Sequence, residues 1–406
     1  MTFQTPITVA QAIENIERES YLLPGIQREF VWSHEKVERL FDSLLRGYPI
    51  SSFLFWRVEG DAKGQHDFYK FLRNYRQKYK THNEEVDAKN RNDFLAVLDG
   101  QQRLTALYLG LRGTYAYKRP RVWDADNEYA YPPRKLYLDL IQPEEIEEDG
   151  REYNFRFLTQ EECATNSERW FEVARILGLG DDFEFDQFLE NSGIKTKNKW
   201  GWRALSKLKS SIHSTRIINF YLETEPSIEK ALNIFIRINS GGEPLSYSDL
   251  VMSVAVSSWK KRKAREEINN LCDEILDLGF HINKDIILRL FLLLHSEDVR
   301  FKTKNFTKDI ANKVESSWDQ IRMAFLEVFR LLKFYGFTNL TLTSKNAVLP
   351  IIYYVINKGN AANIVESKSE FDNRRIIARW LHVLILNQTM ATQSDRVLKV
   401  LRDTIK

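Results

Sequence analysis

The stretch FLAVLDGQQR, residues 94–103, decides how the first half of this chain folds. Its opening residues are apolar, and a short apolar run that ends at a turn residue is typical of a buried β-strand. Beyond Gly100, apolar residues recur at the spacing of one helix face, at Leu104, Leu107, Tyr108 and Leu111. The stretch therefore predicts a strand that ends at Asp99, a tight turn at Gly100, and a helix whose first turn contains Arg103.

The same turn carries side chains suited to binding an anion. Free N–H groups at a helix start attract phosphate, and a glycine lets an anion approach the backbone. Arg103 could bind two phosphate oxygens, while Gln101 and Gln102 could hold a base, a sugar or an attacking water. Asp99 could orient water or hold a metal ion. A tight turn with solvated polar side chains explains these residues equally well, so the turn alone leaves both interpretations open.

A second segment, QREFVW at residues 27–32, places a polar pair beside two large aromatic side chains. Arg28, next to Gln27, could bind phosphate. Phe30 and Trp32 alternate as core residues of an extended chain do, and this structural interpretation is the favoured one for Trp32.

A third segment is FIRIN at residues 235–239, followed by a serine and two glycines. Taken alone, it has the character of a helix C-terminus, with Asn239 or a glycine in the left-handed position. Its Arg237 and Asn239 become candidate site residues only in combination with the other two segments.

Hydrophobic periodicity divides the chain near residue 245. Strand-like and helical patterns alternate before that point, whereas the periodicity is almost wholly helical from residue 246 onward. This pattern predicts an α/β or α+β domain over residues 1–245, of which we take α+β, and a helical domain over residues 246–406. Within the first domain, apolar residues at helical spacing also predict a helix over residues 67–80.

Composition bounds the class of protein. The chain has 406 residues and a formal net charge of +3, so any nucleic-acid binding must come from local basic faces. Its two cysteines form no paired CxxC motif, so we expect neither a zinc site nor a disulfide framework. The N-terminus has no signal-peptide core, and the longest apolar run is far too short for a bilayer. A cytoplasmic protein without a membrane partner is therefore expected.

Three basic runs are candidates for such local faces. They read YRQKYK at residues 75–80, KRPR at residues 118–121 and WKKRKAR at residues 259–265. Each could contact a phosphate backbone, although a charge run is more often a solvated helix face. The assignment to DNA binding falls on four residues of the last run: Lys260, Lys261, Arg262 and Lys263.

Taken in order, QREFVW, DGQQR and FIRIN, with GGEPLS at residues 241–246, resemble a known family. It is the N-terminal module of the GmrSD-type modification-dependent restriction proteins, and DGQQR is its hallmark. The resemblance covers about residues 10–250. It implies a fold distantly similar to the ParB and sulfiredoxin-like domains, and a role in bacterial defence against phage, often by type IV restriction of modified DNA.

The resemblance also implies a site that binds and hydrolyses an NTP. The catalytic residues would be Asp99, Gln101, Gln102 and Arg103. The nucleotide-binding residues would be Gln27, Arg28, Gly100, Arg103, Arg237 and Asn239, gathered in one pocket. Mg²⁺ is an expected companion, and no metal ligand set is assigned. Since the chain contains no GxxxxGK[ST] motif, the DGQQR turn would replace a P-loop. Arg103, at a helix start, is not expected to be needed for core packing.

Partners follow from the same resemblance. The family's usual partner is an HNH-like nuclease domain, fused or encoded separately, and none of the seven histidines lies in a suitable arrangement. DNA, including modified phage DNA, and a separate HNH-type nuclease subunit are therefore the expected partners, and the oligomeric state is left open. The hypotheses, in order, are an NTPase that gates DNA engagement, a DNA-binding module without turnover that recruits a nuclease, and a ParB-like nuclease.

Overall fold

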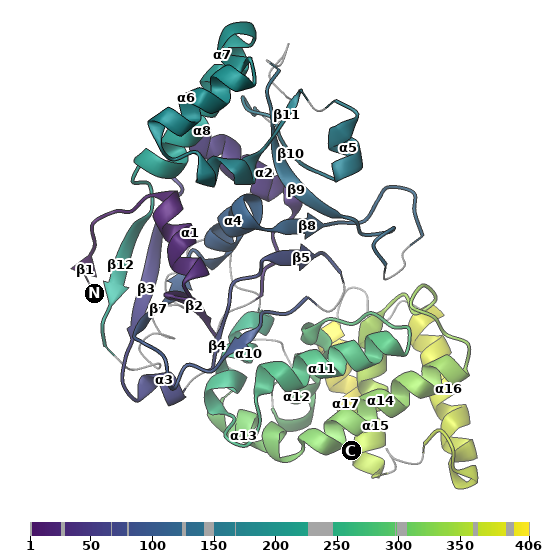
Figure 1. Cartoon of the computed structure of the whole chain (residues 1–406). Helices are drawn as coiled ribbons and strands as arrows, with labels where there is room; N and C mark the ends of the chain where they lie inside the picture. The colour runs from purple at the N-terminus through teal and green to yellow at the C-terminus, as the bar shows by residue number, and fades with distance from the viewer. Residues whose placement is uncertain are drawn as a thin grey trace. The chain divides into compact units, whose positions relative to one another are not determined.

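The computed structural model divides into two compact units, Met1–Asn239 and Ser240–Lys406 (Figure 1). The first combines β-sheets with helices and the second is built of helices, which confirms the α+β class. The residues described are 2–25, 29–65, 67–78, 81–123, 127–141, 150–166, 168–225, 247–296, 298, 307–359, 364–386 and 394–405.

A seven-stranded sheet forms the centre of the first unit, in the order β1-β12-β3-β7-β2-β4-β6. Its strands are β1 (Thr2–Phe3), β2 (Tyr21–Pro24), β3 (Ser52–Val58), β4 (Phe68–Tyr69), β6 (Glu85–Val86), β7 (Phe94–Asp99) and β12 (Asn219–Glu223). The central strand β7 pairs antiparallel with β3 and parallel with β2. The carboxyl ends of β2 and β7 therefore lie at the same edge of the sheet.

A second sheet has the order β10-β9-β8-β5, with β11 added beside β9. Its strands are β5 (Asn74–Arg76), β8 (Thr114–Ala116), β9 (Pro133–Asp139), β10 (Phe155–Leu158) and β11 (Trp170–Glu172). All its pairings are antiparallel except that of β5 with β8, which is parallel.

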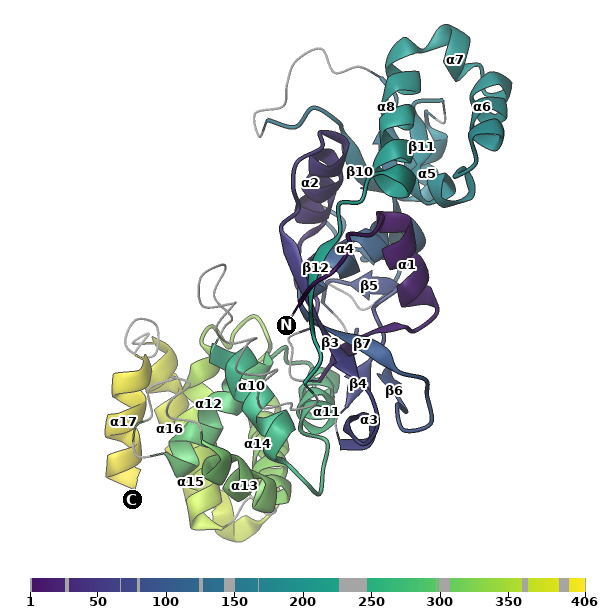
Figure 2. The same ribbon diagram turned by 90° about the vertical axis from the view of Figure 1, so that its left-hand side faces the viewer.

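Helices fill the space around these sheets. They are α1 (Val9–Glu17), α2 (His34–Leu45), α3 (Ala62–Gln65), α4 (Gln101–Arg112), α5 (Gln160–Ala164), α6 (Asp182–Asn191), α7 (Ile194–Lys197) and α8 (Lys199–Lys209), with a 3₁₀ helix at Val173–Gly178 and a π turn at Ser210–Ser214. Figure 2 shows α1 and α4 on one side of the seven-stranded sheet. Along α4 every residue except Arg103 and Arg112 is buried, so this helix runs through the interior.

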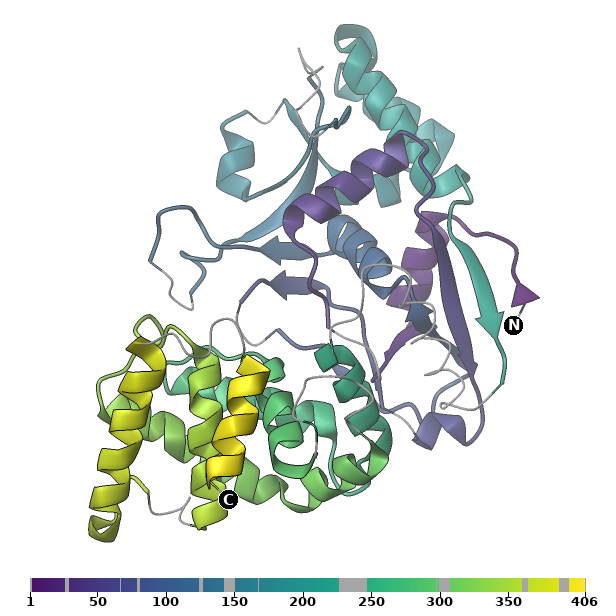
Figure 3. The same cartoon turned by 180° about the vertical axis from the view of Figure 1, so that it is seen from behind.

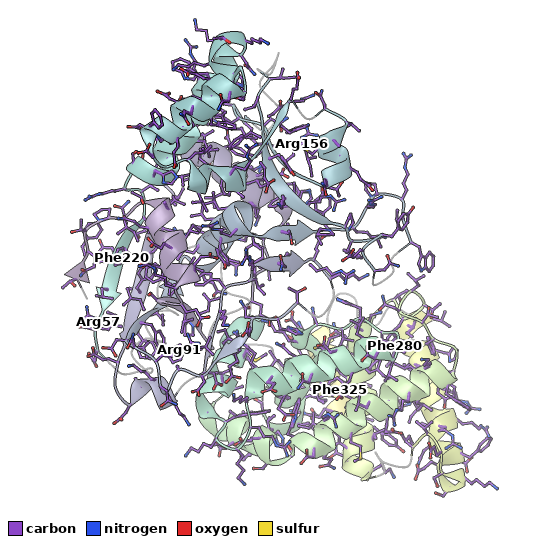
Figure 4. All side chains as sticks on the ribbon, viewed as in Figure 1. Arg57, Arg91, Arg156, Phe220, Phe280 and Phe325 are labelled. Atoms are coloured by element: carbon purple, nitrogen blue, oxygen red, sulfur yellow. The ribbon has the colours of Figure 1, made fainter. Side chains whose placement is uncertain are left out.

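Alternation along the strands separates two cores. In β3, Phe53 and Phe55 pack with α1, α2 and α4, whereas Leu54 and Trp56 pack on the opposite face with β4 and β6. Phe220 of β12, marked in Figure 4, lies with its ring centroid 4.8 Å from that of Phe55. The seven-stranded sheet is thus covered on both faces.

The second unit consists of helices around its own core. They are α10 (Tyr247–Ser258), α11 (Ala264–Asp277), α12 (Lys284–His295), α13 (Lys308–Ser316), α14 (Trp318–Phe334), α15 (Leu349–Lys358), α16 (Phe371–Leu386) and α17 (Ser394–Ile405), with 3₁₀ turns at Lys345–Val348 and Lys368–Glu370. Figure 3 shows them from behind, with α16 and α17 in yellow tones. Trp318 is fully buried and packs against Trp259 and Phe291. Among the described helices, none is both long and apolar enough to cross a membrane.

The helix predicted over residues 67–80 is wrong for the described part, residues 67–78. Phe68 pairs with Val86 in the first sheet, and Tyr75 pairs with Tyr115 in the second. The aromatic residues at helical spacing therefore belong to strands of two different sheets, and tertiary pairing overrides the local pattern.

The strand–turn–helix prediction at FLAVLDGQQR is confirmed: β7 ends at Asp99 and Arg103 lies in the first turn of α4. Gly100 has a φ of 87° and a ψ of 6°, which is the left-handed region. A Cβ at this position would lie 2.1 Å from Cδ1 of Phe53. Both backbone conformation and packing therefore require glycine.

We predict that Gly100→Ala lowers the free energy of unfolding of the first unit by roughly 2–5 kcal/mol, from left-handed strain and overpacking together. Gly178→Ala is the matched control, because a Cβ there would meet nothing within 4 Å. Chemical denaturation of both variants checks this. Equal stability of the two would contradict the packing argument.

Two buried carboxylates attach α2 to the second sheet. Glu38 accepts a hydrogen bond from the backbone N–H of Phe157 at 3.0 Å, and Asp42 accepts one from that of Tyr153 at 2.8 Å. Burial raises the pKa of Glu38 to about 7, against the opposing effects of the Phe157 N–H and of Arg151. The protonated form of Glu38 is therefore favoured in the folded state.

The pH dependence follows from that sign. Because the folded pKa of Glu38 exceeds its unfolded value of 4.5, stability should fall as pH rises from about 4.5 to about 7. Glu38→Gln keeps an acceptor for Phe157 and should remove this decline, on the order of 2–3 kcal/mol at about 1.4 kcal/mol per pH unit. Urea unfolding across this range tests it, with the exposed Glu184→Gln as control. An unchanged decline in Glu38→Gln would refute the assignment.

Candidate functional site

The DGQQR turn lies where β2 and β7 end. Helix α4 begins there at Gly100, so its first N–H groups face the edge shared by the carboxyl ends of two parallel strands. Gly100 caps the helix without a side chain of its own, so no N-cap side chain occupies those N–H groups. Helix N-termini and the carboxyl ends of parallel strands are both places where anionic ligands bind.

Gln102 ties the QREFVW segment to this turn. Its Oε1 accepts a hydrogen bond from the backbone N–H of Val31 at 2.9 Å, and its Nε2 donates one to the backbone carbonyl of Glu29 at 3.0 Å. The side chain is buried, with the residue 9% exposed. Two motifs about 70 residues apart in sequence are thus held together, and the primary contact of Gln102 is with protein backbone.

Arg103 is held by three neighbours. Its Nη1 donates to the carbonyl of Ile50 at 2.6 Å, its Nη2 lies 3.1 Å from Oδ2 of Asp99, and its guanidinium carbon lies 4.6 Å from the ring centroid of Phe53. Only 16% of the side chain is exposed, and burial lowers the pKa of Arg103 while Asp99 opposes that effect.

The expectation that Arg103 is not needed for packing is therefore wrong. Sequence places it correctly in the first helical turn, but the chain before β3 closes over it. This part of the chain, just before β3, includes Ser51, whose φ of 67° is unusual for a residue other than glycine. The neighbouring Gln101 is also buried, at 7% exposure, and does not lie open to solvent.

The remaining nucleotide-binding candidates lie outside the described residues: Gln27, Arg28, Arg237 and Asn239. Their gathering into one pocket stays a prediction. Strand β12, which precedes the third motif, runs parallel to β3 and so ends at the edge opposite to Asp99. Near that end, Nε1 of Trp56 donates to the carbonyl of Glu225 at 2.9 Å.

The aromatic residues of the first motif are structural. Phe30 is 3% exposed and packs edge to face with Tyr75, at 5.0 Å between ring centroids. Trp32 is partly buried against the same core, and its carbonyl accepts a hydrogen bond from the Tyr115 hydroxyl at 2.8 Å. The structural interpretation of Trp32 is confirmed. Sequence patterns did not reveal the contact of His82 with this motif, because His82 belongs to no motif. Its Nδ1 lies 3.1 Å from Oε1 of Glu29.

The basic run at residues 260–263 is a turn between α10 and α11 and not a helix face. Oε1 of Glu315 accepts the backbone N–H groups of Lys260, Lys261 and Arg262 at 2.9, 2.6 and 3.0 Å. The guanidinium of Arg262 also pairs with Asp319 at 2.7 Å. The side chains of Lys260, Lys261 and Lys263 are exposed. Their role in DNA binding stays a prediction.

A cavity of about 520 Å³ lies beside α1 at the other end of α4, lined among others by Glu17, Arg112 and His213. It is separated from Gly100 by the length of α4, about 18 Å at 1.5 Å per residue. The cavity is therefore not part of the DGQQR turn. No group of three His, Cys, Asp or Glu side chains suited to a metal ion occurs in the described ranges.

Comparison with known proteins now identifies the family. Residues 9–256 match the family described as "GmrSD restriction endonuclease, N-terminal domain". The chain belongs to this family. The GmrSD N-terminal domain thus spans all three motifs, and the resemblance seen in sequence is confirmed. The similarity to ParB and sulfiredoxin-like domains stays a prediction.

The chain is also similar to a protein of Methanocaldococcus jannaschii that is named only as uncharacterized. The two are 23% identical over 320 residues, a match that covers 74% of this chain and 50% of that protein. The chain therefore spans about half the length of this relative.

We predict that Gln102→Leu loosens the first motif without unfolding the unit. Loss of two hydrogen bonds, each contributing about 0.5–1.5 kcal/mol, should speed amide hydrogen exchange at Val31 by roughly 5- to 150-fold. Gln187→Leu on the exposed face of α6 is the control. Unchanged exchange at Val31 in Gln102→Leu would show that the side chain does not hold this segment.

Proposed function

We propose that this GmrSD N-terminal domain is the nucleotide-binding module of a bacterial, cytoplasmic restriction system that acts against phage. An NTP would bind at the DGQQR turn, and its hydrolysis would gate engagement of modified DNA. A nuclease domain or subunit of HNH type would cut that DNA. The observation that supports this most is the left-handed Gly100, which starts α4 at the carboxyl ends of β2 and β7.

The turn suits a phosphate group in several respects. The first N–H groups of α4 carry the partial positive charge of a helix start, and no N-cap side chain is hydrogen-bonded to them. Arg103 is already oriented by Ile50 and Asp99, and a guanidinium has further N–H donors for a phosphate oxygen. A charge that is oriented in advance stabilises a developing transition state without reorganisation.

Asp99 fits a supporting role toward Mg²⁺. Magnesium in NTP sites is bound by one or two carboxylates together with the substrate phosphates, where it neutralises developing charge. Asp99 is the carboxylate that the turn itself supplies, and its Oδ2 is oriented by Arg103 at 3.1 Å. Gln101 and Gln102 retain the roles proposed from the motif, with Gln102 acting also through the Glu29–Val31 backbone.

The decisive measurement is phosphate release by the full chain with ATP or GTP and Mg²⁺. Arg103→Lys keeps the charge but loses the planar fork that reaches Ile50 and Asp99 together, so turnover should fall at least about tenfold. Arg112→Lys, at the other end of α4, is the matched control and should keep wild-type turnover. Arg103→Ala should lose turnover and also melt at a lower temperature, because Asp99 and Ile50 lose their partner.

Other outcomes separate the rival hypotheses. Wild-type turnover in Arg103→Lys would contradict a phosphate role for this residue. Nucleotide binding or DNA binding without phosphate release would favour a module that recruits a nuclease and does not hydrolyse. Nicking of plasmid DNA by the purified chain with a divalent metal would favour the ParB-like nuclease.

A further inference from the structure

The parallel pair of β5 and β8 brings two of the basic runs together. Tyr75 is in register with Tyr115, and Arg76 with Ala116, so both strands leave the sheet at the same edge. The N–H of Gln77 donates to the carbonyl of Ala116 at 2.9 Å, which extends the pairing by one residue. Residues 77–78, which follow β5, therefore leave the sheet beside residues 117–118, which follow β8, although the two stretches are about 40 residues apart in sequence.

Cations follow both strands in the chain, and two of them, Lys78 and Lys118, lie near enough to repel each other. Lys78 follows β5, and Lys118 and Arg121 follow β8. Burial, and then repulsion from Lys118, lowers the pKa of Lys78, as expected for two ammonium groups held near each other. Like charges placed together raise the energy of the isolated protein, so a surface of this kind favours an anionic partner.

The cations differ in whether the fold already neutralises them. Arg119 lies 3.8 Å from Glu161, and the buried Arg134 lies 3.7 Å from Glu162. In contrast, Lys118 and Arg121 are exposed and have no ion pair with an acid among the described residues. The same loop carries an exposed acid, Glu128. Asp124 and Asp126 lie outside the described residues.

Exposed aromatic side chains accompany these cations. Trp123 is 77% exposed and Tyr129 is 67% exposed, although large aromatic rings are usually buried. The guanidinium of Arg119 lies over the Tyr129 ring, 5.4 Å from its centroid. A protein surface that mixes cations with exposed rings can meet both the phosphates and the apolar faces of the sugars of a nucleic acid.

We propose that the β5/β8 surface, made of Lys78, Lys118, Arg121, Trp123 and Tyr129, binds the sugar–phosphate backbone of duplex DNA. Lysine and arginine from two adjacent loops present charge over a wider area than one loop could, which suits a row of phosphates better than a single anion. Contacts of this kind are independent of base sequence and position the protein on the duplex. This inference rests on the DNA engagement in the proposed function and not on nucleotide hydrolysis.

Residues 29–34 connect this surface to the DGQQR turn. Gln102 holds the backbone on either side of Phe30, and Phe30 packs against Tyr75 of β5. Further along, the Tyr115 hydroxyl of β8 donates to the carbonyl of Trp32. His34 then stacks on Tyr117, which directly follows β8, with 3.8 Å between ring centroids and 7° between planes. The strands that lead into the proposed DNA surface and the DGQQR turn therefore contact one continuous segment.

The test is binding of the full chain to a fluorescent 30-base-pair unmodified duplex, without nucleotide, at several salt concentrations. The variant Lys118→Ala with Arg121→Ala removes two phosphate contacts. Each phosphate contact steepens the slope of log affinity against log salt concentration by roughly 0.9, so the slope of the variant should be smaller in magnitude by about 1.8. At about 0.1 M salt, its affinity should be lower than that of the wild type by up to about 60-fold. The control, Lys197→Ala with Arg203→Ala, removes the same charge from exposed positions in α7 and α8 and should bind like wild type.

Several results would overturn the inference. They are equal loss of affinity in variant and control, absence of salt-dependent binding by the wild type, or at least tenfold tighter binding of a single strand or an RNA of the same sequence. Phosphate release is measured on the same preparations. If the wild type binds DNA but releases no phosphate, and Lys118→Ala with Arg121→Ala loses that DNA binding, the DNA surface is supported and only NTP hydrolysis is contradicted. If the wild type releases phosphate but does not bind DNA, NTP hydrolysis is supported and the DNA surface is contradicted.

Discussion

The contact between Gly100 and the ring of Phe53 is the constraint on which the first unit depends. The space that a Cβ would need at residue 100 is filled by an aromatic side chain of the neighbouring strand, and the backbone there is left-handed. This closeness allows α4 to start directly after β7 and to continue through the interior between the two sheets. It also lets the guanidinium of Arg103, in the first turn of α4, lie over the same Phe53 ring. Strand, turn, helix and cation form one packed arrangement.

Local pattern predicted the part of the fold that depends on near neighbours in sequence. The apolar run before Asp99 and the stripe after Gly100 lie within one strand and one helix, so periodicity located both. It failed at residues 67–78, because the aromatic residues there pair with partners in two sheets that are distant in sequence. The boundary of such short strands depends on which partner is present, and no window of sequence contains that information.

The candidate site shows the same division. The position of Arg103 in the first helical turn followed from spacing, but its engagement by Ile50 did not, since the two residues are 53 apart. The proposal that Gln102 contacts a ligand followed from the motif, but the two hydrogen bonds from its amide to the backbone at Glu29 and Val31 did not. Side chains that act on backbone have no sequence signature of their own. The meeting of the chain after Arg76 with the chain after Ala116 could not be predicted either, because it depends on the parallel pairing of β5 with β8.

The burial of α4 has a mechanical consequence. A helix that is enclosed at all but two of its positions can neither bend into free space nor rotate without displacing the core around it, because protein interiors are packed as densely as organic crystals. It therefore behaves as a stiff rod. A shift along the axis at its Gly100 end would be transmitted almost undiminished to Arg112, which lines the open cavity beside α1. Any displacement at the end of α4 that carries the motif would therefore also displace its other end, at the cavity.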